Sequence, residues 1–179
     1  MPQIQIHTQS PKEASELYAM NHAYFTEYTW QMNRKILPNE VSIQFRQVRL
    51  PRQIIVDPPR SVAERRAANL LADIVLVSLH EGEPVAYAVL EKNEHKPIVR
   101  IVDFVVKQKM RRQGVGAALL LAAQDWSLSE GCQRIVAEIQ SKNQPAIQLV
   151  KKMGYDYCGF HEFHYANHDI VLFFSSYLR

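Results

Sequence analysis

The chain contains 179 residues, which fits one compact domain and argues against two complete ones. With 47% apolar and 22% charged residues, the composition excludes an intrinsically disordered chain, and no apolar run reaches the roughly 18 residues that a membrane-spanning helix needs. The formal net charge of +3 is too small to indicate nucleic-acid binding by itself, although it suits an anionic ligand.

The cysteines and the N-terminal segment predict where the protein resides. Cys132 and Cys158 are too few for a secreted disulfide scaffold and lack the spacing of a zinc site, so we expect both to be reduced core residues. The first ten residues, MPQIQIHTQS, have neither the basic stretch nor the apolar stretch of an export signal. We therefore expect a cytoplasmic protein with no membrane partner.

Residues 11–32 predict an amphipathic helix rich in aromatic side chains. Ser10 suits its N-cap and Pro11 its first helical position, and apolar residues then recur at helical spacing. These aromatics either pack in the core or wall a pocket for an amine by cation–π contact. They are Tyr18, Tyr24, Phe25, Tyr28 and Trp30.

The next segment changes from helical spacing to alternation. Residues 41–56 alternate between apolar and polar side chains, which predicts two short strands or a hairpin, interrupted at Pro51. Ser61 and Glu64 then form a capping box that opens a short basic surface helix to about residue 72.

The remaining chain predicts alternating strands and helices. Residues 74–79, 85–90 and 98–106 form a meander of three antiparallel strands. Residues 114–129, apolar on nearly all sides, form a largely buried helix that Gly131 ends. The last elements are a strand at 134–139, a helix between Asn143 and Gly154, and a hairpin of 155–165 with 170–177 around Asn167.

This order predicts a mixed α/β (α+β) domain with one central sheet and helices on both faces. The strand at 98–106, the helix at 114–129 and the strand at 134–139 form a βαβ unit, whose two strands are parallel and joined by a right-handed crossover. We expect the functional site at that crossover.

The loop between the first strand and the helix of this unit suits a phosphate. Gly114 and Gly116 let the backbone approach a ligand, and the N–H groups at the helix start carry the positive end of the dipole. Four cations without an acid strengthen the case for a polyanion. These are Lys107, Lys109, Arg111 and Arg112. The alternative is that the glycines only permit close helix–sheet packing and that the basic run is solvated.

Two motifs in this region resemble the GNAT superfamily of N-acetyltransferases. The loop reads Arg111-x-x-Gly114-x-Gly116 and resembles the family's motif A, Q/R-x-x-G-x-G/A. Downstream, the chain is similar to motif B in Asn143-x-x-Ala146-x-x-Leu149-x-Lys151-x-x-Gly154-Tyr155. The resemblance covers roughly residues 74–177, and residues 1–73 match only in starting with a helix. Asp103 before Val106, and the C-terminal residues 165–179, are more loosely similar to streptothricin acetyltransferases.

The resemblance implies a GNAT-type, mostly antiparallel sheet in a single domain, with 1–73 on the acceptor side and 74–179 as the cofactor-binding core. It implies acetyl-CoA as acyl donor, no metal, and direct attack of a primary amine of a small molecule or peptide on the thioester. The pantetheine arm would lie beside residues 104–106, where a bulge splays the sheet and the Val106 N–H bonds the acetyl carbonyl. The residues it assigns to the cofactor are Phe104, Val105, Val106, Arg111, Arg112, Gln113, Gly114, Val115, Gly116, Ala117, Asn143, Ala146 and Lys152.

The catalytic assignments start from Asp103, a carboxylate inside an otherwise apolar strand. It is a candidate general base because an amine of pKa about 10.4 must lose a proton, and the alternative is a structural or substrate-orienting carboxylate. Val150 stands where many relatives carry a tyrosine acid. Tyr165 and Tyr155 are the substitutes, with Tyr155 assigned to the core, and water can also protonate the thiolate.

Two other groups of polar residues, the C-terminal histidines and the arginines of residues 46–60, give weaker indications of function. His161 and His164 should face opposite sides of a strand, which argues against a metal site shared with His168. The arginines of residues 46–60 contact an acidic acceptor, the cofactor's 3′-phosphate or only water. Two alternatives stay open, an acyl-CoA sensor without turnover and a nucleic-acid-binding domain that uses residues 46–66, and so does a homodimer.

Overall fold

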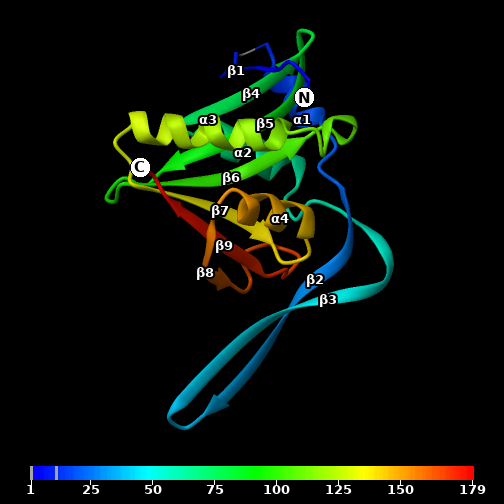
Figure 1. Cartoon of the computed structure of the whole chain (residues 1–179), viewed down its shortest axis with the longest axis vertical. Coiled ribbons are helices and arrows are strands. Elements are labelled where there is room, and N and C mark those ends of the chain that lie inside the picture. Colours follow the sequence, from blue (N-terminus) through cyan, green and yellow to red (C-terminus); the bar gives the residue numbers. More distant parts are fainter. Residues whose placement is uncertain (1, 11) are drawn as a thin grey trace.

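The computed structural model describes residues 2–10 and 12–179, and its centre is a seven-stranded sheet (Figure 1). All neighbouring strands are antiparallel except β6 and β7, which are parallel, as the βαβ pattern predicts. In spatial order the strands are β1 (Gln5–Thr8), β4 (Ile74–His80), β5 (Glu83–Lys92), β6 (Ile98–Val106), β7 (Arg134–Gln140), β9 (Val171–Tyr177) and β8 (Asp156–His161).

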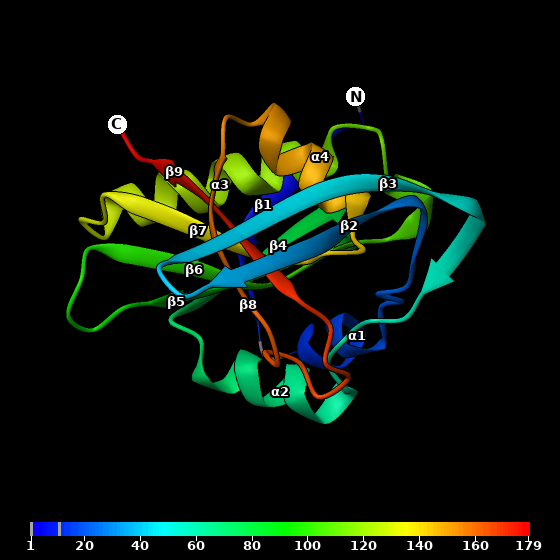
Figure 2. The ribbon, with the colours of Figure 1, turned by 90° about the horizontal axis from the view of Figure 1, so that it is seen from below.

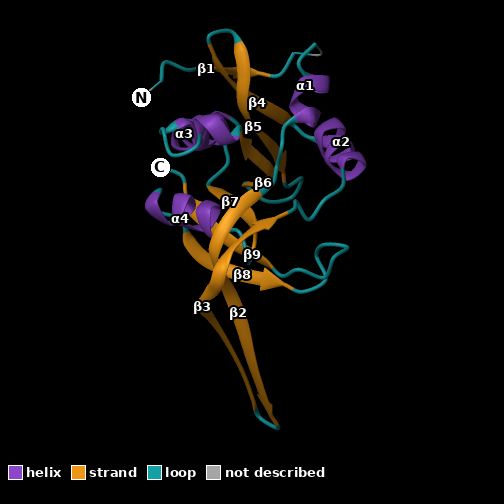
Figure 3. Ribbon diagram, turned by 90° about the vertical axis from the view of Figure 1, so that its right-hand side faces the viewer, coloured by secondary structure: helices purple, strands orange, loops and turns teal. Residues whose placement is uncertain are grey.

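Helices cover both faces of this sheet. Figures 2 and 3 show α3 (Val115–Ser129) and α4 (Gln144–Lys152) on one face, and α1 (Ala14–Ala19) and α2 (Val62–Leu71) on the other. The alternation of side chains along a strand supplies both cores. In β5, Ala88 and Leu90 pack on the α3 side, whereas Tyr87 and Val89 join Leu17 on the α1 side. The predicted mixed α/β architecture is confirmed.

The sheet opens between its two parallel strands. Ile98–Ile101 of β6 pair with Arg134–Ala137 of β7, and beyond this point the two strands are no longer paired. The register between β5 and β6 shifts at the same place, because Val89 faces Asp103 while Leu90 faces Ile101. Val102 is therefore the bulged residue. The sequence placed this bulge around 104–106, and the structure places it before Asp103.

A long hairpin leaves the body of the protein (Figure 1). It consists of β2 (Tyr24–Leu37) and β3 (Glu40–Val56). Its base is tied to the body by the Trp30 N–H, which donates to the Ser141 carbonyl at 2.9 Å. Further out, Phe45 packs edge-on against Phe160 of β8 with 5.1 Å between ring centroids.

This hairpin corrects the prediction of one helix over 11–32. Only α1 is helical there, and Tyr24, Phe25, Tyr28 and Trp30 belong to β2. Aromatic and β-branched residues favour strands, and here that preference and the pairing with β3 outweigh the helical spacing. The predicted N-cap role fails for Ser10, since α1 begins at Ala14, and the position of Pro11 lies outside the described residues.

The strand predicted as interrupted is continuous. β3 runs through Pro51, and the register with β2 shifts between Thr26 and Tyr28, opposite that proline. A bulge is a position that tolerates proline in a strand. The capping box of α2 is confirmed, because Ser61 accepts from the Glu64 N–H while the Glu64 carboxylate accepts from the Ser61 N–H.

The cysteines differ from one another. Cys132 is buried as expected, but Cys158 is exposed, because it lies on β8 at the edge of the sheet. Among the described residues, no helix combines the length and the apolar character that crossing a membrane requires.

Candidate active site

The loop that follows β6 shapes the start of α3. A short 3-10 turn, Gln108–Met110, is followed by Arg112 with a φ of 63° and Gly114 with a φ of 90°. The first bond of the α3 ladder runs from the Ala118 N–H to the Gly114 carbonyl. The N–H groups of residues 115–117 therefore precede the ladder, and they point out of the helix with the positive end of its dipole.

Side chains of this loop are mostly used within the protein. The Arg111 guanidinium donates from Nε to the Val106 carbonyl at 2.9 Å and from Nη2 to the Ala23 carbonyl at 3.0 Å. Lys107 pairs with Glu16 of α1 at 3.1 Å. Gln113 donates to the Lys109 carbonyl at 2.6 Å. Arg111 thus fixes the loop, whereas the predicted cofactor residue Arg112 is exposed.

Gly116 lies where α3 meets α4 and β6. A Cβ atom there would come within 3.2 Å of Leu149 Cδ2 and 3.5 Å of Val106 Cγ2. Gly116 therefore permits close packing of α3 on α4 and β6, while Gly114 supplies the left-handed turn, and the predicted role of both glycines in binding a ligand stays a prediction. Because Gly116 lets α3 pack closely on β6, the N–H groups at the start of α3 lie near the gap between β6 and β7.

A cleft of about 120 Å³ occupies that gap. Its floor is the splayed ends of β6 and β7, one side is α4, and the other side comes from the part of the chain before β4. Lining residues from that part are His22, Tyr24, Pro58, Pro59, Arg60 and Arg65. Those from the sheet and the second half include Val102, Asp103, Phe104, Glu138, Gln140, Asn143, Ala146, Leu149, Val150 and Tyr165.

The predicted motif B residues divide between this cleft and the surface. Asn143 caps α4 by accepting from the Ala146 N–H at 3.1 Å, and both residues line the cleft. Lys152, in contrast, is exposed in the last turn of α4 and outside the cleft wall. Lys151 lies over the Trp30 ring at 5.5 Å, which joins α4 to the base of the hairpin.

The strand edge beside the cleft carries free main-chain groups. The Lys107 N–H donates to the Val85 carbonyl at 2.8 Å, so the alternating N–H groups of Lys107 and Val105 face β5. The N–H groups of Phe104 and Val106 consequently face the opening toward β7. The Phe104 N–H is taken by Asp103 Oδ1 at 2.9 Å, which leaves Val106 as the amide that faces the opening.

Asp103 is joined to a tyrosine and a histidine. Tyr87 donates from its hydroxyl to Asp103 Oδ2 at 2.9 Å, and His22 Nε2 lies 2.9 Å from the same hydroxyl. His22 Nδ1 lies 3.6 Å from Asp103 Oδ1. Burial lowers the pKa of His22, helped by Arg65 and Arg111 and opposed by Asp103, so the imidazole is neutral at pH 7.

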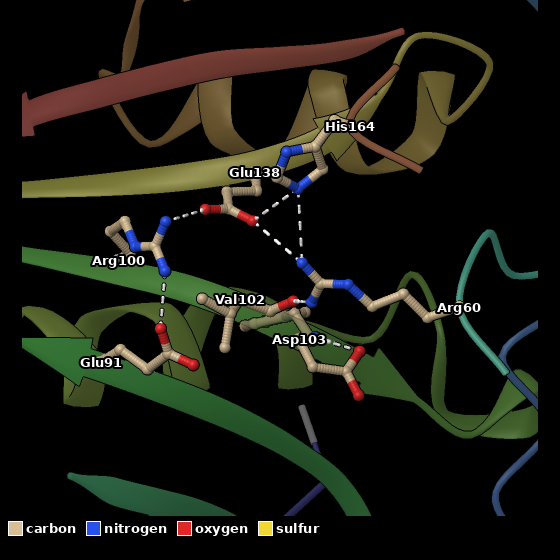
Figure 4. A network of polar contacts seen from close by, with 8 residues as sticks. Arg60, Glu91, Arg100, Val102, Asp103, Glu138 and His164 are labelled. Carbon is tan, nitrogen blue, oxygen red and sulfur yellow. Dashed lines mark hydrogen bonds and ion pairs between the residues drawn. The ribbon is translucent and has the colours of Figure 1, made fainter. Parts of the chain in front are cut away.

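The floor of the cleft holds a buried ion cluster, drawn in Figure 4. The Glu138 side chain is only 1% exposed and lies 3.1 Å from Arg60 Nη2, 3.1 Å from Arg100 Nη1 and 3.3 Å from His164 Nε2. Burial opposes its ionisation, but His164 and the two arginines outweigh burial and lower the pKa of Glu138 below its usual value. Glu138 is therefore a carboxylate at neutral pH.

The Arg60 side chain bridges β6 and β7 where the two strands separate. It also donates to the carbonyl of Val102, the bulged residue of β6, while it holds Glu138 of β7 (Figure 4). A bulge frees a carbonyl from the strand ladder, and here the guanidinium satisfies it. The segment before α2 is thereby fixed across both splayed strands.

Two tyrosines complete the wall of the cleft. The Tyr165 side chain is buried, and burial raises the pKa of its hydroxyl, although Arg60 opposes that shift. Tyr24 donates to Gln140 Oε1 at 2.6 Å, and burial also raises its pKa. Both keep their protons at neutral pH. Tyr155 packs in the main core instead, which agrees with its assignment from the sequence.

Several cleft residues escaped the sequence analysis because their partners are distant in the chain. His22, Arg65 and Glu138 line the cleft and Tyr87 supports Asp103 from behind; none of them carries a local motif, and Glu138 meets Arg60 across 78 positions. The available signals were a charged residue inside each of two apolar strands. Asp103 was singled out on that ground, and Glu138 satisfies the same criterion.

The histidine geometry differs from expectation. The sequence predicted that His161 and His164 face opposite sides of a strand. Instead, His164 lies in the loop after β8, and its ring centroid is 6.0 Å from that of His161. Within the described ranges, no three histidine, cysteine or acidic side chains gather as a metal site would require.

Comparison with known protein families shows the family to which this chain belongs. The sequence profile of the acetyltransferase (GNAT) family matches residues 43–155, which is more than half of the chain. The chain belongs to the GNAT family of acetyltransferases. The match includes the turn before α3, the splayed strands and α4, whereas His22, Tyr24 and Tyr165 of the cleft lie outside the matched residues.

One curated relative aligns with part of this GNAT chain. It is a streptothricin acetyltransferase from Streptomyces lavendulae, 27% identical over 79 residues. The aligned part covers 44% of this chain and 42% of that relative, so the chain matches less than half of the relative's length.

Solved structures agree over nearly the whole fold. A nourseothricin acetyltransferase superposes with a TM-score of 0.83 at 18% identity, covering 98% of this chain and 99% of that one. A protein described as a streptothricin acetyltransferase from Bacillus anthracis, solved with acetyl coenzyme A, gives 0.76 at 17% identity, covering 99% and 98%. At these identities the likeness concerns the fold, and it extends to the hairpin that the family profile covers only in part.

Proposed function

We propose that this GNAT protein transfers the acetyl group of acetyl-CoA to the primary amine of a small molecule. The observation that carries the proposal is that the N–H groups at the start of α3 precede its hydrogen-bond ladder and lie beside β6, where Gly116 packs against Phe104, which lines the cleft between the splayed parallel strands. A helix start favours phosphate, and a free strand-edge amide favours a carbonyl oxygen.

The residues present fit acetyl-CoA. Residues 112–117 would hold the diphosphate by main-chain amides, and Gly116 keeps α3 near the cleft. Phe104 on β6, Asn143 at the N-cap of α4, and Ala146 and Leu149 on α4 line the cleft and would flank the pantetheine arm, whereas Val105 packs in the core on the α1 side of the sheet. When bound, acetyl-CoA supplies an activated acyl group as a thioester.

Two neighbouring groups can take a proton from the acceptor amine. We propose Asp103 as the proton acceptor, because its carboxylate lines the cleft and is oriented by Tyr87 and by the Phe104 N–H. His22 is neutral and lies beside it, so its Nδ1 is a second acceptor. A positioned base of this kind contributes about 10²- to 10⁴-fold to a rate.

Tyr165 is the proposed hydrogen-bond donor to the leaving thiolate, which water then protonates. Its hydroxyl keeps its proton because burial raises the pKa, and its ring lines the same cleft. A thiol has an ordinary pKa of about 8.5, so it leaves readily as an anion. Tyr165 therefore needs only to hold a hydrogen bond in the cleft while water completes the protonation.

The proposal is tested by CoA release with acetyl-CoA and a panel of amines. The panel includes streptothricin, because relatives of this chain carry that name, together with aminoglycosides, polyamines, amino acids and N-terminal peptides. We expect thiol release with at least one small-molecule amine. Release only with peptides would contradict the small-molecule assignment.

A matched pair of variants isolates the phosphate-binding turn. Ala117→Glu adds a carboxylate in the first turn of α3, where an acidic side chain stabilises a helix but repels a diphosphate. Leu121→Glu adds the same charge at an exposed position one turn later. Calorimetry with CoA should show a much weaker Kd for Ala117→Glu and little change for Leu121→Glu. Tight CoA binding without turnover on any amine would favour the acyl-CoA sensor.

A further inference from the structure

Arg65 is a buried charge without a counter-charge. Its residue is 7% exposed, and it lies on α2 in the wall of the cleft. Its Nη1 donates to the Arg60 carbonyl at 2.6 Å, and its Nε has no hydrogen-bond partner. Within the described part of the chain, no carboxylate comes within 4.0 Å of its guanidinium.

The carboxylates of the cleft are already engaged. Glu138 is held by Arg60, Arg100 and His164, and Arg100 also pairs with Glu91, so the two guanidinium groups of this cluster are matched by two carboxylates. Asp103 accepts from Tyr87 and from the Phe104 N–H. Neither carboxylate forms an ion pair with Arg65, which leaves one cation unneutralised in a confined space.

An isolated buried charge is costly, and the cost falls when a ligand supplies the opposite charge. A guanidinium matches a carboxylate in shape, because both are planar and can form two parallel hydrogen bonds. The cleft therefore offers one negative group for an amine, Asp103, and one positive group for an acid, Arg65.

We infer that the acceptor of this enzyme is a zwitterion, a small primary amine that also carries a carboxylate, and that Arg65 binds the carboxylate. The inference rests on the proposed acetyl transfer and names the acceptor class for the same cleft. The cleft has no surplus of negative charge for a polycationic acceptor. Acetylation of the amine leaves the carboxylate unchanged, so Arg65 acts in binding and takes no part in the proton transfers.

The test compares acceptors with and without the carboxylate, at equal concentrations of the neutral amine because the amine of the amide is less basic. Amino acids and their amides share the same primary amine, but the amides lack the carboxylate. With saturating acetyl-CoA, we expect kcat/KM for the preferred amino acid to exceed that of its amide by about 10- to 100-fold, the range of one charge-assisted contact. Equal values, a preference for the amide, or much faster turnover of streptothricin would overturn the inference.

Variants then assign the preference to Arg65. Arg65→Met should remove the preference by lowering kcat/KM for the amino acid while leaving the amide nearly unchanged, and Arg65→Lys should restore part of it. Arg66→Met is the matched control, because Arg66 is the neighbouring exposed arginine and lies over the Tyr18 ring at 5.2 Å. If Arg65→Met lowers both values equally, Arg65 is only structural and the inference is wrong.

Binding separates this inference from the proposed transfer. Calorimetry on the CoA-loaded protein measures the Kd of the N-acetyl derivatives of the same amino acids and of their amides. Binding that requires the carboxylate and is lost in Arg65→Met supports the inference even when no amine is acetylated. Absence of such binding in the wild-type protein overturns it. If Arg65→Met does not fold, the comparison of Arg65→Lys with wild type decides.

Discussion

The hydroxyl of Tyr87 on β5 donates a 2.9 Å hydrogen bond to the Asp103 carboxylate on β6. Burial raises the pKa of Tyr87, and the Asp103 charge raises it further, so the tyrosine keeps its proton and acts as a donor. Because a hydroxyl has only one proton, the network assigns the Nε2 proton to His22, which donates to Tyr87. Asp103 is thereby held in one orientation at the cleft.

Replacing Asp103 tests its role as proton acceptor. Asp103→Asn keeps the shape and a hydrogen-bond acceptor but removes the basic group, so we expect kcat to fall by about 100-fold or more. Steady-state kinetics over pH 5–9 measures the change. Asp125→Asn on the exposed side of α3 is the matched control. An Asp103→Asn enzyme with the wild-type kcat and pH profile would remove Asp103 from the mechanism.

Tyr87→Phe probes the orientation of that carboxylate. The substitution removes the donor to Asp103 and the acceptor of His22 without changing the packed ring. We expect a stability loss of about 2 kcal/mol, as for other hydrogen bonds to charged groups, and a smaller fall in kcat than for Asp103→Asn. Urea unfolding and the same kinetic assay measure both effects. A kcat loss as large as that of Asp103→Asn would instead place Tyr87 in the proton transfer itself.

His22 predicts acid sensitivity in a defined pH window. Its folded pKa lies below the unfolded value of 6.5, so the unfolded chain binds this proton first as pH falls. The stability that His22 contributes is complete above pH 6.5 and is lost as the pH falls through the folded pKa. The pKa of Glu138 lies below its ordinary value of 4.5, so its protonation reduces stability only at a lower pH than the protonation of His22.

Thermal unfolding at pH 7.5, 6.0 and 5.0 measures this window. We expect the wild-type Tm to fall between pH 6.5 and 5, and the fall to be reduced in His22→Gln. His95→Gln, at an exposed turn, should retain the wild-type slope. Equal slopes in His22→Gln and wild type would show that His22 is not the group that titrates.

The second half of the fold followed from local sequence signals. Alternation in residues 74–106, the glycine before α3 and the Asn143 cap each act within a few residues, so β4 to α4 lie where they were predicted. The turn proposed to bind the diphosphate could be singled out for the same reason, because its groups belong to one continuous segment.

The contacts that the N-terminal part of the chain makes with the cleft could not be predicted from local signals. Tyr24 bonds Gln140 and Arg60 bonds Glu138, and these partners come together only when the sheet forms. The aromatic residues after position 23 fitted helical spacing as well as alternation, and pairing with β3 decided for the strand. Arg111 also kept its motif position but holds two carbonyls rather than standing free for phosphate.

Glu138→Gln should destabilise the protein through the charges it leaves behind. Arg60 and Arg100 lose their buried partner, and breaking such a pair costs about 3 kcal/mol. Glu91→Gln is the matched control, since Glu91 contacts the same Arg100 at 2.6 Å but is more exposed, and it should cost under about 1 kcal/mol. Urea unfolding at pH 7 compares the two. A similar loss in both variants would show that burial of Glu138 has no special weight.

The contact between Gly116 and Leu149 predicts a coupling between the phosphate-binding turn and α4. Gly116→Ala places a methyl group 3.2 Å from Leu149 Cδ2, so the leucine must move, and the space toward which it can move is the cleft. We expect the Kd for CoA to rise about 10-fold, while Leu149→Ala alone changes it less. The double variant should recover most of the affinity, because the truncated side chain leaves room for the new methyl group. Calorimetry on the four proteins gives the coupling energy, which for contacting residues is about 0.5–3 kcal/mol. Additive effects of the two substitutions would mean that the turn adjusts without displacing Leu149.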